Sequence, residues 1–82
     1  MLDEFDLFVL QAICKATHIS KSAHVPPEAF VKRLPYSGRR IKKALQKIIT
    51  SGYVQLHPTR GGMTYGLTRA GLDICRQTFQ KK

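Results

Sequence analysis

Hydrophobic residues recur three and four positions apart in the middle of the chain, between positions 37 and 51. This spacing predicts an amphipathic helix, because residues at i, i+3, i+4 and i+7 share one face. The apolar face consists of Ile41, Ala44, Leu45 and Ile48. Ser37 is a favourable N-cap and Gly52 is favourable just beyond the C-terminus, so the local sequence marks both helix ends.

The polar positions of this predicted helix are strongly basic. They hold five Lys or Arg residues and no acid, which leaves little intrahelical ion pairing. The direction opposite the apolar face is occupied by Arg39, Lys43, Gln46 and Thr50. Arg40 and Lys47 flank the apolar face on one side, and Lys42 flanks it on the other. We expect this surface to bind a polyanion; the alternative is a basic face that is merely solvated.

A first helix is predicted from Asp3 to about Thr17, with acidic residues in its first turn. It is apolar on two sides. One broad side consists of Phe5, Phe8, Val9, Ala12, Ile13 and Ala16, and a second, nearly opposite side of Leu7, Leu10 and Cys14. Such a helix needs two packing partners. We expect the domain core to cover one side and a second subunit the other; alternatively, helices of the same chain cover both.

Another helix is predicted to start at Pro26-Pro27-Glu28 and to end before Pro35, after a possible short strand at Val25. Only Pro35 and Tyr36 separate it from the Ser37 cap of the basic helix. Two helices joined by so tight a turn, with the second basic and facing outward, form a helix-turn-helix. Gly38 would allow close approach of a helix or of a phosphate.

After Gly52 the hydrophobic period changes from 3.6 to 2. Residues 53–57 and 63–67 are therefore predicted to form a short hairpin, joined by a turn over 58–62 with Arg60 at its tip.

Thr68 is the predicted N-cap of a last helix that runs to about Phe79. Leu67 and Leu72 occupy the positions of a hydrophobic staple, and Leu72, Cys75 and Phe79 form the apolar stripe. Gly71 stands where the Glu of a capping box would be.

Composition places this pattern in one small domain, residues 1–82, mostly α-helical with a small β-hairpin (α+β). The formal net charge is +9 and the sequence pI is about 10.1. No acid lies between Ala29 and Leu72, whereas nine Lys or Arg residues do. This regional excess of positive charge favours an anionic partner. Nucleic acid is favoured over a membrane, because the basic helix has no bulky aromatic residue for insertion.

Other function classes find little support in the sequence. No apolar run could span a bilayer, and the N-terminus is acidic where a signal peptide would be basic, so we expect a cytoplasmic protein. Cys14 and Cys75 are expected to be free core residues, since a disulfide would be unusual in a reducing cytoplasm. Neither metal-ligand spacing nor a catalytic constellation involves His18, His24 or His57, so we expect no enzyme activity, metal or cofactor.

The order of the predicted elements resembles that of a winged helix-turn-helix domain, with three core helices, a two-stranded wing and a C-terminal helix. The sequence RLPYSGRRI at 33–41 and SGYV at 51–54 resemble the turn, recognition helix and first wing strand of small prokaryotic repressors. The sequence YGLTRAG at 65–71 resembles the Y-x-L-T-x-x-G that closes the wing in the MarR and PadR groups. The chain departs from these groups in its short wing and in lacking long extra dimerisation helices, so no small-molecule ligand is expected.

The resemblance implies a transcriptional regulator that binds double-stranded DNA sequence-specifically. Major-groove contacts would come from Arg39, Lys42, Lys43 and Gln46. Phosphate contacts would come from Ser37, Arg40 and Lys47, and Arg60 would reach the backbone or a narrow minor groove. Alternatively, the same basic surface binds structured RNA, for example on a ribosome, or the domain is a protein–protein interaction module.

A single winged helix reads too few base pairs to find a site in a genome, so we expect a homodimer. The predicted interface consists of Leu7, Leu10 and Cys14 of the first helix with Ile74 and Phe79 of the last.

Overall fold

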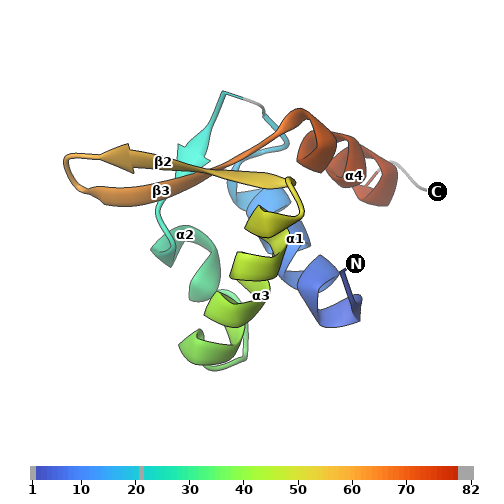
Figure 1. The fold of residues 1–82 in the computed structure, drawn as a ribbon, viewed down its shortest axis with the longest axis horizontal. Coiled ribbons are helices and arrows are strands. Elements are labelled where there is room, and N and C mark those ends of the chain that lie inside the picture. Colours follow the sequence, from blue (N-terminus) through green and yellow to red (C-terminus); the bar gives the residue numbers. More distant parts are fainter. Residues whose placement is uncertain (1, 21, 80–82) are drawn as a thin grey trace.

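The computed structural model describes residues 2–20 and 22–79, without the side chain of Phe79. The elements are α1 (Glu4–Ala16), β1 (His24–Val25), α2 (Glu28–Val31), α3 (Gly38–Thr50), β2 (Val54–Thr59), β3 (Gly62–Leu67) and α4 (Arg69–Phe79) (Figure 1). The predicted fold class is confirmed: a mostly helical chain with a small antiparallel sheet.

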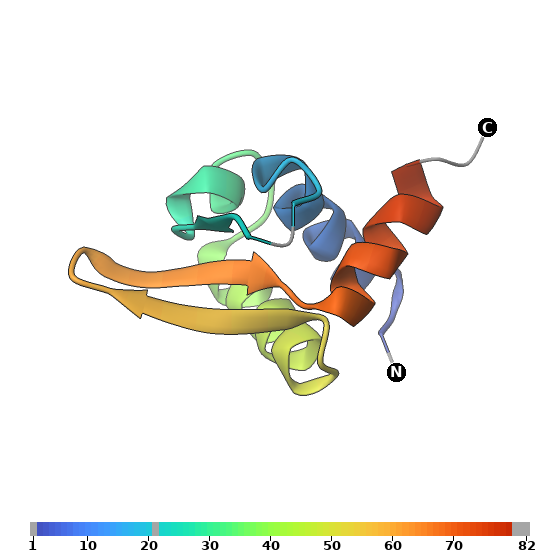
Figure 2. The same ribbon diagram turned by 90° about the horizontal axis from the view of Figure 1, so that it is seen from above.

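The sheet has three strands in the order β1-β3-β2, because β1 adds to the predicted hairpin by pairing Val25 with Tyr65. The register of the hairpin runs from the pair Val54–Leu67 to the pair Thr59–Gly62. Its turn is shorter than predicted, since only Arg60 and Gly61 lie between the strands. Figure 2 shows the hairpin reaching away from the helices, with α4 on the opposite side of the molecule.

The helix predicted before Pro35 is shorter than expected. After α2 ends at Val31, the backbone continues in tight turns, in which the Arg33 and Leu34 N–H groups donate to the carbonyls of Phe30 and Val31. Bonds of this i→i+3 type tighten the chain before the proline. Leu34 is still buried, so the segment keeps its apolar contact with the core.

The core encloses α1 on both of its apolar sides. Leu10 and Cys14 are 0% and 1% exposed within the single chain, as are Val9 and Ile13 on the other side at 0% each. The prediction that Leu10 and Cys14 form a subunit interface is therefore wrong. The alternative holds for these two residues, because α4 and α3 both pack against α1 and leave no surface there for a partner.

Cys14 and Cys75 are not free thiols. They form a disulfide that joins α1 to α4, with Cα atoms 5.8 Å apart and a separation of 61 positions in sequence. Both residues are buried as predicted, but the expectation that they stay reduced is wrong. Only the packing of the first helix on the last brings these two side chains together.

The first turn of α4 lies directly on the backbone of Tyr53. A Cβ on residue 71 would collide with the Tyr53 carbonyl group, which explains the glycine at the capping-box position. The cap is made by Thr68 instead, since its hydroxyl accepts the Gly71 N–H at 3.1 Å and donates to the carbonyl of Gly52. Close packing here joins α4 to the start of the wing.

Candidate nucleic-acid interface

The orientation of α3 about its own axis is fixed by its buried face. Ile41, Ala44, Leu45 and Ile48 are all at most 5% exposed, as the periodicity predicts. The helix begins at the predicted cap, where the Ser37 hydroxyl accepts the Arg40 N–H at 3.3 Å. The opposite face of α3 consequently points to solvent.

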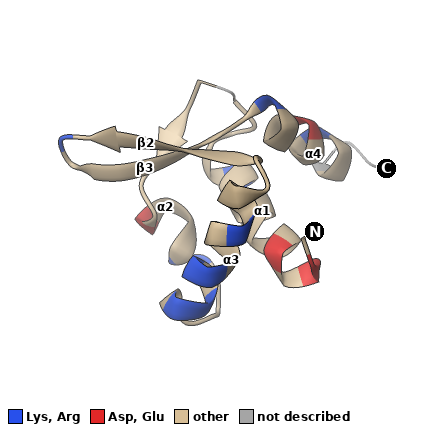
Figure 3. Cartoon of the chain, viewed as in Figure 1, with Lys and Arg blue, Asp and Glu red and all other residues tan. Residues whose placement is uncertain are grey.

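This outward face carries a row of cations and one amide. Arg39, Lys42, Lys43 and Gln46 are all exposed. Within residues 2–20 and 22–79, the structure gives no ion pair to any of the three cations. Figure 3 shows the basic residues along α3 and the acidic residues of α1 on the other side of it. Unpaired cations on a rigid helix keep their charge available for an anionic partner.

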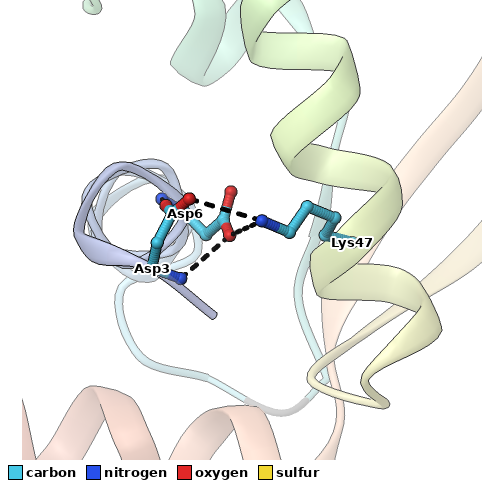
Figure 4. Close-up of polar contacts among 3 residues, drawn as sticks. All are labelled: Asp3, Asp6 and Lys47. Carbon is cyan, nitrogen blue, oxygen red and sulfur yellow. Dashed lines mark hydrogen bonds and ion pairs between the residues drawn. The ribbon is translucent and has the colours of Figure 1, made fainter. Parts of the chain in front are cut away.

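Lys47 differs from these residues because its ammonium group is paired within the chain. It lies 2.7 Å from a carboxylate oxygen of Asp6 and 3.4 Å from one of Asp3, both at the start of α1 (Figure 4). The Asp6 side chain is only 3% exposed, whereas that of Lys47 is 47% exposed. The hydrogen bond to Asp6 raises the pKa of Lys47. The predicted phosphate contact of Lys47 would thus have to compete with this internal pair.

The two carboxylates are themselves fixed by the end of α1. Asp3 is the N-cap and accepts the Asp6 N–H at 2.9 Å, while Asp6 accepts the Asp3 N–H at 3.0 Å. The Asp6 N–H is the main cause that lowers the pKa of Asp3, and Lys47 adds to it. This reciprocal capping box holds both carboxylates in place through hydrogen bonds that do not involve Lys47.

Arg40 also contacts α1, but in a way that leaves it free to bind. Its guanidinium lies 4.5 Å from the ring centre of Phe5 and 5.3 Å from that of Tyr36. The two rings meet edge to face with centres 4.9 Å apart, so the guanidinium sits in the corner between them. A guanidinium stacked on a ring keeps its N–H edges available, and a phosphate contact by Arg40 remains compatible with this geometry.

Arg60 provides a second basic position at the tip of the wing (Figure 3). It is exposed, and the turn that carries it is closed by a hydrogen bond from the Thr59 hydroxyl to the Gly62 carbonyl at 2.8 Å. The wing therefore presents one cation on a well-formed hairpin, apart from those of α3.

The sequence did not reveal the side chains that Arg40 and Lys47 contact on α1 and in the turn before α3. Phe5, Asp6 and Tyr36 were placed as core, first-turn and linker residues, with no relation to Arg40 or Lys47. The D-x-x-D spacing of Asp3 and Asp6 signals a capping box, but their contact with a residue more than forty positions away requires the fold.

Among the residues that the structure describes, no cluster of three or more His, Cys, Asp or Glu residues could hold a metal ion. Two of the scattered histidines, His24 and His57, do meet as stacked rings 3.8 Å apart. No helix among the described residues is long and apolar enough to cross a membrane.

No protein-family model matches this chain, and a comparison with curated proteins gives no match. Solved structures do match it. A mutant MarR from E. coli complexed with operator DNA superposes with a TM-score of 0.76 and 23% identity, over 96% of this chain and 54% of that one. This chain has a MarR-like winged helix fold. The reduced form of MarR gives a TM-score of 0.78 at 22% identity, over 96% of this chain and 56% of MarR.

TubR from Bacillus thuringiensis serovar israelensis, bound to 24 bp of tubC, matches with a TM-score of 0.77 and 18% identity. That match covers 98% of this chain and 84% of TubR. The chain spans about half the length of the MarR chains that it matches. The resemblance to the MarR group is thus confirmed at the level of the fold.

Proposed function

We propose that this MarR-like winged helix binds double-stranded DNA and regulates transcription, with α3 in the major groove. The observation that carries the proposal is the row of exposed cations, Arg39, Lys42 and Lys43, on the outward face of a helix whose rotation the core fixes. The major groove admits an α-helix, and Arg or Lys can pair with guanine O6 and N7 there.

The roles proposed for individual residues follow from their positions on α3 and the wing. Arg39, Lys42, Lys43 and Gln46 would face base edges, with Gln46 suited to adenine. Ser37 and Arg40, at the start of the helix, would contact phosphates, which position a protein without reading sequence. Arg60 would reach the backbone or a narrow minor groove beside the site. Lys47, whose ammonium group is paired with Asp6, is not included among these contacts.

Two of the matched folds were determined with DNA, MarR with operator DNA and TubR with 24 bp of tubC. These complexes support duplex DNA over the alternatives, structured RNA or a protein partner. A DNA-bound regulator would work in the cytoplasm, where the Cys14–Cys75 disulfide would need protection from reduction; its complete burial provides that.

We also propose a homodimer, on a surface that differs from the one expected. Leu7 is 38% exposed on α1 and borders a groove with Leu2, Ser51, Tyr53 and Ile74. Leu7 and Ile74 therefore remain candidates, whereas Leu10 and Cys14 do not. The side chain of Phe79 lies outside the described part of the structure. Two copies joined here would present two α3 helices to one duplex.

The proposed function is tested by measuring binding to duplex DNA, duplex RNA and single strands at two salt concentrations. Five unpaired or ring-stacked cations, Arg39, Arg40, Lys42, Lys43 and Arg60, face outward. If four or five of these charges displace counterions from the duplex, in the groove or at phosphates, the log–log salt slope for duplex DNA should be about −4 per monomer. Tighter binding of duplex RNA would favour the RNA alternative, and binding without salt dependence would contradict both.

A further inference from the structure

We propose that Asp6 and Lys47 are positioning residues for DNA recognition: the pair sets the orientation of α3 and touches no DNA. This inference rests on the proposed function and assigns a new role to one of its expected phosphate contacts. Asp3 supports the pair from the helix cap. The first turn of α1 would thereby belong to the recognition machinery without reaching the duplex.

The geometry of the pair supports a positioning role. Lys47 lies two turns beyond Arg40, and both side chains extend from α3 to the first turn of α1. At 1.5 Å per residue, these two contacts are about 10 Å apart along the axis of α3. Two contacts at this spacing restrain the tilt of α3 relative to α1 as well as the distance between the two helices. The buried apolar face fixes the rotation of α3, and these two contacts add restraints on α3 from outside that face.

The burial of Asp6 explains why Lys47 stays paired with it and does not bind a phosphate. The Asp6 carboxylate is nearly inaccessible, and its oxygen receives both the Asp3 N–H and the Lys47 ammonium. Removing Lys47 to bind a phosphate would leave a buried charge without its cation, which is strongly unfavourable. Lys43, one turn earlier on the same helix, has no such partner within the described residues, so its charge can approach the duplex without this cost.

A positioning role and a purely electrostatic effect predict opposite changes in DNA binding for Asp6→Asn. Asp6→Asn removes a negative charge and releases Lys47, so a purely electrostatic effect would tighten DNA binding. A positioning role predicts the opposite for a preferred sequence. Asn can still accept the Asp3 N–H, so the substitution keeps the capping geometry and removes only the charge.

The experiment first selects a preferred duplex from a random library with the wild-type protein and then measures binding to that duplex and to random duplex. We expect Asp6→Asn and Lys47→Met each to weaken binding to the preferred duplex about fivefold to tenfold, and to change binding to random duplex less than about twofold. Lys47→Arg should restore the preference, because it keeps the ion pair. Circular dichroism establishes that each variant is folded.

The matched control is Lys43→Met, which removes a lysine one turn away on α3. A lysine in the major groove displaces condensed counterions, so its loss should make the salt slope shallower by up to about 0.9, whereas Lys47→Met should leave the slope unchanged. Tighter binding by Asp6→Asn, or a shallower slope for Lys47→Met, would overturn the positioning role while the proposed function stands. If the wild type binds no duplex in a salt-dependent way, the proposed function fails, and the positioning role fails with it. Should Asp6→Asn not fold, the slope and preference of Lys47→Met decide the question.

Discussion

The guanidinium of Arg40 lies 4.5 Å from the centre of the Phe5 ring, which connects the start of α3 to the first turn of α1. A cation held against a ring loses less conformational freedom when it binds a phosphate than a free side chain would. Phe8 lies on the same helix and also meets Tyr36 edge to face, but it has no contact of this kind with Arg40. The two phenylalanines therefore form a matched pair for testing the value of this contact.

Phe5→Leu should weaken DNA binding about threefold to fivefold, because it leaves Arg40 without its main support, worth about 0.5–1 kcal/mol. Phe8→Leu should have little effect. The measurement is fluorescence anisotropy with one labelled duplex. Repeating both substitutions in an Arg40→Met background provides the control: the effect of Phe5→Leu should then disappear. An equal loss in both backgrounds would mean that Phe5 acts through general stability.

Leu7→Glu should convert the proposed dimer into a folded monomer. Leu7 is already 38% exposed in the single chain, so a charge there can remain solvated without disturbing the core, but it would oppose an apolar subunit contact. DNA binding should weaken at least about tenfold, because a monomer engages one half-site. Light scattering measures the mass. A wild type that is monomeric at micromolar concentration would exclude the dimer.

Gly71→Ala should destabilise the domain by about 3 kcal/mol, because the added methyl group would collide with the Tyr53 carbonyl. Gly38→Ala is the control. A Cβ at residue 38 meets nothing within 4 Å, so alanine should leave stability unchanged or raise it by up to about 1 kcal/mol. Urea unfolding measures both. If Gly38→Ala keeps stability but weakens DNA binding, the open space beside Gly38 accommodates a phosphate.

Reduction of the Cys14–Cys75 disulfide should lower the free energy of unfolding by about 2–4 kcal/mol. The bond joins residues 61 positions apart in sequence, and losing it raises the entropy of the unfolded chain. Thermal unfolding with and without a reductant tests this, after a thiol assay shows that the buried bond has been reduced. An unchanged midpoint in fully reduced protein would show that packing of α1 on α4 suffices.

Acid should weaken the end of α1 through Asp3. The Asp6 N–H and Lys47 lower the pKa of Asp3 from its ordinary 3.8, so the charged form is stabilised in the folded state. That contribution is present above the unfolded value and is lost as the pH falls through the folded pKa. Asp3→Asn keeps an N-cap but no charge. Between about pH 5 and pH 2 the wild type should lose more stability than Asp3→Asn; parallel curves would contradict this.

Local patterns in the sequence predicted the elements that depend on neighbouring residues. The apolar face of α3 and its Ser37 cap arise within a few positions, and the structure has both; Leu67 and Leu72, predicted to form a staple, are both buried. Most of the two predicted apolar sides of α1 is buried, although Leu7 and Phe8 are 38% and 43% exposed. The partners of these sides were not predicted, because which surface covers Leu10 and Cys14 depends on where α4 packs.

The same limit applies to the candidate site. Periodicity placed Arg39, Lys43 and Gln46 on the outward face, since a helix of known rotation determines which residues point away from its core. It placed Lys47 beside the apolar face with Arg40, but it could not distinguish a lysine that is paired within the chain from one that is available to bind phosphate. That distinction depends on Asp6, which lies more than forty positions away in sequence and becomes a neighbour only when α1 packs against α3.

Pro58, in β2, gives the wing a further property. β2 is the outer strand of the sheet, and hydrogen-bonded and non-bonded pairs alternate along an antiparallel ladder from the Thr59–Gly62 pair beside the turn. The missing N–H of Pro58 is thus one that would point away from β3. A strand from another molecule would find no donor there, so the open margin of this sheet is a poor template for fibre growth. The hairpin can project far from the helices and still resist aggregation.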